Sequence, residues 1–160
     1  MGSKIGELRG RLGPDIIEQD DALERGEEIV EEVGEIDNTL DSIDTSNVDD
    51  ETAAQVEIVR ENARAAARED LEGDVGARVE EANSDALSIS DDAKTLEQGN
   101  REAADQFSQV ASTEFGSSGS EGVATANQEA EEAADLSSEA QERSDSAIAR
   151  LEALKSQLGG

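Results

Sequence analysis

The feature that most constrains this chain is a seven-residue repeat that persists through much of its length. From Val75 to Val110, small or apolar residues return at alternating steps of four and three positions, and a second run extends from Ala126 to Leu158. A repeat of seven over so many turns is typical of helices packed along a common seam. The sequence therefore predicts an all-α fold: three or four long helices in elongated antiparallel hairpins or a coiled-coil bundle.

A third seam, expected between Pro14 and Asp44, is the most strongly apolar. Its members are Ala22, Gly26, Ile29, Val33, Ile36, Leu40 and Ile43. In the two later runs the larger seam residues are Val79, Ile89, Leu96, Phe107, Leu151, Leu154 and Leu158. We predict that these side chains pack within the chain or against a partner. Most other seam positions near the C-terminus are Ala or Ser, so each buries little area and the helices there must approach closely.

Gly10, Gly13 and Pro14 are expected to separate a basic amphipathic N-terminal arm, residues 1–13, from a first helical hairpin, residues 14–72. Within this hairpin, residues 45–47 are expected to form the turn, with Asn47 as the cap of the following helix.

Two glycines three positions apart, Gly73 and Gly76, mark a candidate hinge at residues 73–76, with a continuous helix as the alternative. A second, longer hairpin is expected at residues 77–158. Its loop is predicted at residues 115–122, where Ser and Gly predominate.

The chain carries 41 acidic and 13 basic residues, of which only three are lysine, for a net charge of -28. Low hydrophobicity with high net charge is typical of disordered chains. Acid-rich, lysine-poor surfaces also resemble those of proteins from extreme halophiles. The long repeat favours a folded halophilic protein, and a chain that is disordered in dilute buffer is the alternative. Both descriptions hold if salt screens the self-repulsion, since the Debye length falls to about 3 Å at 1 M salt.

Catalysis is not expected, and no cofactor or metal is predicted. The chain has no His and no Cys, so it cannot build a Ser-His-Asp triad, a Cys-His pair or a metal site with nitrogen or sulfur ligands. The densest acidic stretches, residues 37–41 and 49–51, do not match the spacing of a calcium-binding loop. We interpret them as solvated acidic faces.

The charge also limits the partners. Nucleic acids and anionic membranes would repel so acidic a surface. No stretch approaches the roughly 18 apolar residues of a membrane span, and no signal peptide is recognisable. The expected partners are therefore other copies of this chain or another helical protein. The expected location is the cytoplasm or a virion, with export by a route that needs no signal peptide as the alternative.

Two basic features are candidates for specific contacts. In the N-terminal arm, Ile5, Leu8 and Leu12 share one helical face near Lys4, Arg9 and Arg11. This face is a candidate docking site for a partner, and the alternatives are a frayed end or an arm folded back on the acidic body.

The second feature is a ladder of arginines at four-residue spacing, Arg60, Arg64 and Arg68. It predicts either a docking face for an acidic partner or pairing with acids of its own helix, at residues 57, 61 and 72.

Phe115 and Gly116 lie in the predicted loop between two long helices, and Phe115 is expected to pack that loop against a helix end. Over residues 75–158 this arrangement resembles small secreted helical hairpins of the WXG type, which carry Trp-X-Gly in the loop. The resemblance implies a secreted hairpin. Here phenylalanine replaces the tryptophan, no residue separates Phe115 from Gly116, and the C-terminal export signal is absent.

These observations together predict a non-enzymatic structural or interaction protein of a halophile or its virus. It would act by coiled-coil helix packing and self-assembly. The alternatives are an adaptor or regulator that binds another helical protein, and a secreted hairpin of the WXG type.

Overall fold

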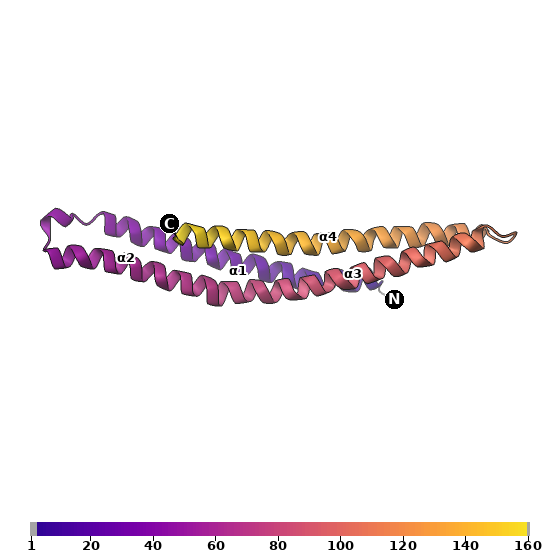
Figure 1. Cartoon of the computed structure of the whole chain (residues 1–160), viewed down its shortest axis with the longest axis horizontal. Helices are drawn as coiled ribbons and strands as arrows, with labels where there is room; N and C mark the ends of the chain where they lie inside the picture. Colours follow the sequence, from indigo (N-terminus) through magenta and orange to yellow (C-terminus); the bar gives the residue numbers. More distant parts are fainter. Residues whose placement is uncertain (1–2, 160) are drawn as a thin grey trace. The chain divides into compact units, whose positions relative to one another are not determined.

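The computed structural model describes residues 3–159, and its regular structure is helical, with no strand in that range. Four α-helices follow in order: α1 (Lys4–Asp41), α2 (Asp50–Asp70), α3 (Gly76–Ala111) and α4 (Ser117–Gly159), as Figure 1 shows. A 3-10 turn, Thr45–Asn47, lies between α1 and α2, and a π-helical turn, Leu71–Val75, joins α2 to α3. The predicted all-α class is confirmed, because long helices pack against one another in a bundle.

Packing contacts group the described residues into two compact units, each with its own core. Unit 1 comprises residues 3–16 and 83–145, and unit 2 comprises residues 17–82 and 146–159. The core of unit 1 consists of Ile5, Leu8, Leu12, Ala86, Ile89, Ala93, Ala133, Leu136 and Ala140. The core of unit 2 consists of Ala22, Leu23, Ile29, Val33, Ala67, Leu71, Val75, Val79, Ala147, Leu151, Leu154 and Leu158. The hairpins expected at 14–72 and 77–158 do not coincide with these units, because α1, α3 and α4 each contribute residues to both cores.

Helix α1 begins at Lys4 and continues through Pro14, where we expected a new helix to start. The Oγ of Ser3 accepts a hydrogen bond from the N–H of Gly6 at 2.9 Å, as a helix N-cap does. A proline in a helix interior costs about 3 kcal/mol. The three apolar residues of this segment in the core of unit 1 are at most 8% exposed, and burying each contributes about 1.5–3 kcal/mol, which offsets that cost. Residues 1 and 2 of the expected arm lie outside the described residues.

One wide turn joins α2 to α3 where we expected a candidate hinge at residues 73–76. Residues 71–75 form a π-helical turn with α-helix on both sides. The chain is therefore helical without a break from α2 to α3. A π turn adds a residue to one helical turn. That extra residue allows Leu71 and Val75 to be fully buried although the repeat changes phase here. A Cβ atom on Gly76 would lie 3.0 Å from the carbonyl oxygen of Leu71, which explains the glycine.

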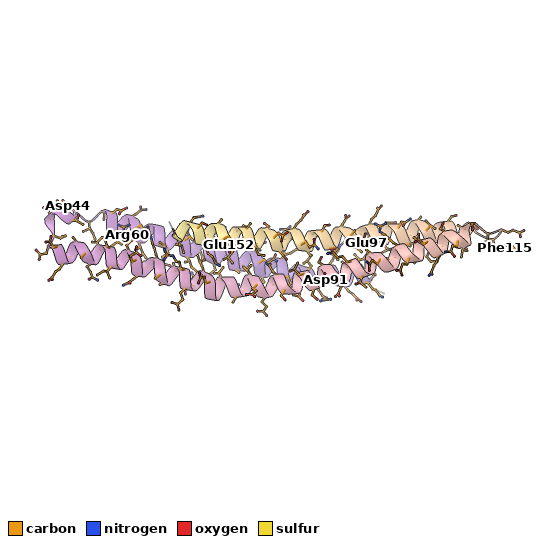
Figure 2. All side chains as sticks on the ribbon, viewed as in Figure 1. Asp44, Arg60, Asp91, Glu97, Phe115 and Glu152 are labelled. Carbon is orange, nitrogen blue, oxygen red and sulfur yellow. The ribbon has the colours of Figure 1, made fainter. Side chains whose placement is uncertain are left out.

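The turn between α1 and α2 is organised by Asp44, labelled in Figure 2. Its carboxylate accepts hydrogen bonds from the backbone N–H of Ser46 at 3.0 Å and from the side-chain amide of Asn47 at 2.8 Å. Hydrogen bonds from Ser46 lower the pKa of Asp44. We had expected Asn47 to cap α2, but the N-cap position belongs to Asp49. Asn47 is unavailable as a cap because it belongs to the preceding 3-10 turn.

The loop between α3 and α4 is shorter than the expected 115–122, because α4 begins within that stretch. A Cβ atom on Gly119 would lie 2.7 Å from the backbone nitrogen of Ala111 and 2.8 Å from the carbonyl oxygen of Phe107. A Cβ atom on Gly122 would lie 2.7 Å from the ring of Phe107. These glycines therefore allow α4 to approach α3 closely, and they do not mark a flexible loop.

We predict that Gly119→Ala lowers the melting temperature, because the new methyl group would meet the backbone of α3. The expected loss is about 1–3 kcal/mol of unfolding free energy, as for other overpacked contacts. The matched control is Gly99→Ala in α3, where a Cβ atom would have no neighbour within 4 Å. That control should gain up to about 1 kcal/mol from helix propensity. Equal stabilisation by both substitutions, measured by thermal unfolding, would show that the helices are not in close contact at Gly119.

Candidate interaction surfaces

The predicted seam residues differ in exposure. Those that are buried are Ile29, Val33, Leu40, Val79, Ile89, Leu151, Leu154 and Leu158. Ile36 and Leu96 are half-buried. Ile43 and Phe107 are 38% and 41% exposed. Ile43 lies two residues beyond the end of α1, and Phe107 belongs to the last two turns of α3, so both lie near helix ends, where fewer neighbours cover them.

Several fully buried residues were missing from the predicted seams, among them Leu23 and Leu136. Each is adjacent to a seam position that is also buried, Ala22 and Ser137 respectively, and all four are at most 4% exposed. A helix that packs against one partner buries a narrow stripe, whereas a helix in a three-helix core buries a wider one. An apolar residue directly beside a seam position was therefore the sequence signal that could have identified Leu23 and Leu136 as buried.

Polar side chains connect α3 and α4 inside unit 1. The hydroxyl oxygens of Ser90 and Ser137 lie 2.8 Å apart, and the side-chain amide of Gln141 donates to Ser90 Oγ at 3.1 Å. Further along, the side-chain amide of Asn83 donates to the carbonyl oxygen of Ser144 at 3.2 Å. These bonds fix the antiparallel register of the two helices, while the hydroxyl oxygen of Ser144 is buried without a partner.

The basic N-terminal segment docks on its own chain. Its apolar face is buried in the core of unit 1, and Arg11 forms ion pairs with Asp92 at 3.2 Å and with Asp85 at 3.8 Å, both on α3. Arg9 is exposed. In the structure, therefore, the N-terminal segment folds back on the acidic body of its own chain.

The arginine ladder on α2 also contacts its own chain. Arg60 pairs with Asp37 at 3.1 Å and with Asp41 at 2.7 Å, and Arg64 pairs with Asp37 at 3.0 Å. Arg68 donates to the carbonyl oxygen of Leu158 at 3.0 Å, near the C-terminal end of α4. Of the expected pairs within the helix, the one from residue 57 to Arg60 is present at 3.8 Å. The arginine ladder therefore pairs with acidic residues of α1 in the same chain.

A groove of about 210 Å³ in unit 2 lies between α1 and α2. Ile29, Val33 and Ile36 line it from α1, and Ala63 and Ala66 line it from α2. Charged residues at its rim are Arg25, Glu32 and Asp70. The groove therefore combines an apolar floor with charged side chains.

A second groove, of about 530 Å³, lies in unit 1 between the start of α1 and the middle of α3. Leu8 and Leu96 are its larger apolar lining residues, and Lys4 and Asp92 are among its charged ones. Lys4 and Gly99 both line it, so the first turn of α1 lies beside this part of α3. The groove thus marks the place along α3 where α1 begins.

Asp15 is the most perturbed carboxyl group among the described residues. When both Asp15 and Asp85 are ionised, the buried Oδ2 atom of Asp15 has no hydrogen-bond partner. Burial, a side-chain hydrogen bond with Asp85 and the negative charge of Asp85 raise the pKa of Asp15 to about 7, while Arg11 opposes the shift. Two ionised carboxylates can only accept hydrogen bonds. When Asp15 carries a proton, its hydroxyl group can donate a hydrogen bond to Asp85.

Among residues 3–159, no group of three or more His, Cys, Asp or Glu side chains is arranged as a metal site. In the acidic stretch 37–41, Asp37 and Asp41 instead accept bonds from Arg60. None of the helices in the described part of the chain combines the length and apolar character needed to cross a bilayer.

Comparison of this chain with protein families, with curated proteins and with solved structures finds no match in any of the three.

We predict that Asp15→Asn becomes increasingly stabilising relative to the native chain as the pH rises from about 4 to about 7. The folded state holds a proton on Asp15 up to about pH 7, whereas an unfolded Asp releases it near 3.9. The native chain therefore loses stability across this window as the pH rises, and asparagine does not titrate. Urea unfolding at four pH values measures the difference.

The control for this experiment is Asp91→Asn, which removes one exposed carboxylate from α3 in the same unit. A stability difference between Asp15→Asn and the native chain that stays constant from pH 4 to pH 7 would contradict the assignment of a shared proton to Asp15 and Asp85.

Proposed function

We propose that this chain is a non-enzymatic structural protein that assembles with further copies of itself by helix packing. The observation that supports this most directly is the open groove of unit 2. Ile36 lines the groove from α1, and Ala63 and Ala66 line it from α2. Ile43 follows Ile36 by seven residues, in the turn after α1, and Val59 precedes Ala66 by seven residues within α2. Val59 is 41% exposed and Ile43 is 38% exposed.

An apolar stripe of this kind is what a helix leaves when its packing partner is missing. A helix from a second copy that lay along Ile36, Ile43 and Val59 would cover side chains that water now contacts. Burial of apolar area contributes about 25 cal/mol per Å², so these exposed residues are a source of affinity. Self-assembly would thus extend the packing that already holds α1 and α2 together.

The charge makes this assembly dependent on salt. A chain with a net charge of -28 repels its own copies in dilute buffer. Raising the salt from about 0.1 M to about 1 M shortens the Debye length from about 10 Å to about 3 Å and removes most of that repulsion. We therefore place the assembly in the salt-rich cytoplasm of a halophile or in a virion that forms there. A second candidate, an adaptor that binds another helical protein, is favoured by the exposed end of the α3–α4 hairpin.

We predict that light scattering in KCl from about 0.1 to 3 M shows a discrete oligomer only at the higher salt concentrations, because repulsion is then screened. The double substitution Ile43→Ser with Val59→Ser should shift the protein towards the mass of one chain at 3 M KCl. Circular dichroism at each concentration reports whether helicity is retained.

The matched control for the double substitution is Ile17→Ser, which removes an apolar side chain of unit 2 that is 61% exposed, away from the groove. It should assemble as the native chain does. A native chain that remains a helical monomer throughout the salt series would contradict self-assembly.

A further inference from the structure

Both aromatic residues of this chain lie at one end of unit 1, and both are exposed. Phe107 is 41% exposed near the end of α3, and Phe115 is 83% exposed in the loop that joins α3 to α4, where Figure 2 labels it. Val110 lies between them in sequence and is 47% exposed. Phe115 was expected to pack the loop against a helix end. The ring that packs there is instead that of Phe107, which lies over Gly122.

These residues lie on the part of the α3–α4 hairpin that α1 does not reach. The first turn of α1 lies beside Gly99 and Asn100, as the groove of about 530 Å³ shows. Beyond that point, residues 101–111 of α3 and 117–127 of α4 have no third helix from the described residues of unit 1. We call this part of the hairpin the tip. Its two helices continue the surface on which α1 packs.

The same hairpin already binds a basic amphipathic helix. Where α1 occupies the third position, its apolar face meets alanines and larger aliphatic residues of α3 and α4, and Arg11 pairs with Asp85 and Asp92. The contact has two parts: burial of apolar residues at helical spacing, and cation pairing with acids that flank them. The tip offers both parts, because it exposes apolar side chains and is acidic.

The charge of the tip identifies the kind of helix that fits. Residues 101–127, the tip and its loop, contain four acids and one base, Arg101, which pairs with Glu97 of its own helix. The one basic amphipathic segment of this chain, residues 4–12, is already docked in unit 1. Another copy of this chain would bring a surface of the same sign to the tip, whereas a cationic helix would be attracted to it.

We propose that the tip of the α3–α4 hairpin binds a basic amphipathic helix of a different protein. The helix would lie in the third-helix position, continuing the site of α1, with its apolar residues against Phe107, Val110 and Phe115. Its lysines or arginines would face the surrounding acids. This contact uses unit 1 and goes beyond the self-assembly assigned above to the groove of unit 2.

The test uses a labelled 21-residue peptide with leucine at the two seam positions of each heptad and lysine elsewhere, and it measures binding by fluorescence anisotropy. The protein is the full chain, in the lowest KCl concentration at which circular dichroism shows it fully helical. The double substitution Val110→Asp with Phe115→Asp should weaken binding about tenfold or more, because the apolar contacts are lost. Phe107 is left unchanged because its ring supports Gly122.

The control, Ile58→Asp with Ile148→Asp, adds the same charge at two residues of unit 2 that are each 49% exposed. Purely electrostatic binding would become slightly tighter in both double variants, since both add negative charge. Weaker binding by the tip variant alone supports the proposal. Equal binding by the two variants, or no binding of the peptide by the native chain, overturns it. Light scattering of the tip variant at 3 M KCl separates this result from self-assembly, which should be unchanged.

Discussion

The close approach of α3 and α4 in unit 1 is the contact on which the rest of that unit depends. It is possible because the contact positions carry small side chains: Ala86, Ala93, Ala133 and Ala140 are fully buried, and Ser90 and Ser137 bond directly to each other. Alanine contacts bury little area, so two such helices gain little from the hydrophobic effect alone. The larger residues of α1 supply that burial, and their insertion explains why α1 remains helical through Pro14. The glycines at the start of α4 extend the same close approach to the end of the hairpin.

The distribution of charge follows from this packing. Alanine-rich seams leave most positions of each helix facing solvent, and the chain fills those positions with acids. Several of its arginines join helices: Arg11 joins α1 to α3, Arg60 joins α2 to α1, and Arg150 pairs with Glu27 at 3.1 Å across α4 and α1. Such exposed pairs contribute little each and are screened by salt. Salt therefore weakens the attraction between helices less than it relieves the repulsion among 41 acids, and we expect a net gain in stability in brine.

The sequence predicted the fold class and most of the core, because a seven-residue repeat reports directly which face of a helix is buried. It did not predict where the helices begin and end. Gly10, Pro14 and Gly73 are common at helix ends, yet here burial of neighbouring residues keeps the helix intact. The serines and glycines of residues 116–122 looked like a loop, since composition alone does not distinguish flexibility from close packing. Leu23 and Leu136 were missed because the prediction assumed pairs of helices rather than cores of three.

For the candidate surfaces, sequence reasoning named residues whose contacts only the structure describes. It identified the basic face of residues 4–12 and the ladder from Arg60 to Arg68, and the structure places their partners within the same chain. The Asp15–Asp85 pair and the exposed position of Phe115 depend on how distant segments meet, which periodicity does not report. The open groove of unit 2 and the tip of unit 1 likewise required knowledge of where each third helix stops.

The central claim is that small side chains hold α3 and α4 together by allowing close contact, and Ala133→Leu tests it most directly. Ala133 is fully buried in unit 1, so the larger side chain should force the helices apart and lower the unfolding free energy by about 1–3 kcal/mol. Ala124→Leu makes the same change at an exposed position of α4 and should have little effect. We expect thermal unfolding in high salt to show a clear loss for Ala133→Leu alone. A leucine at 133 that is tolerated as well as the one at 124 would contradict the close contact on which this account depends.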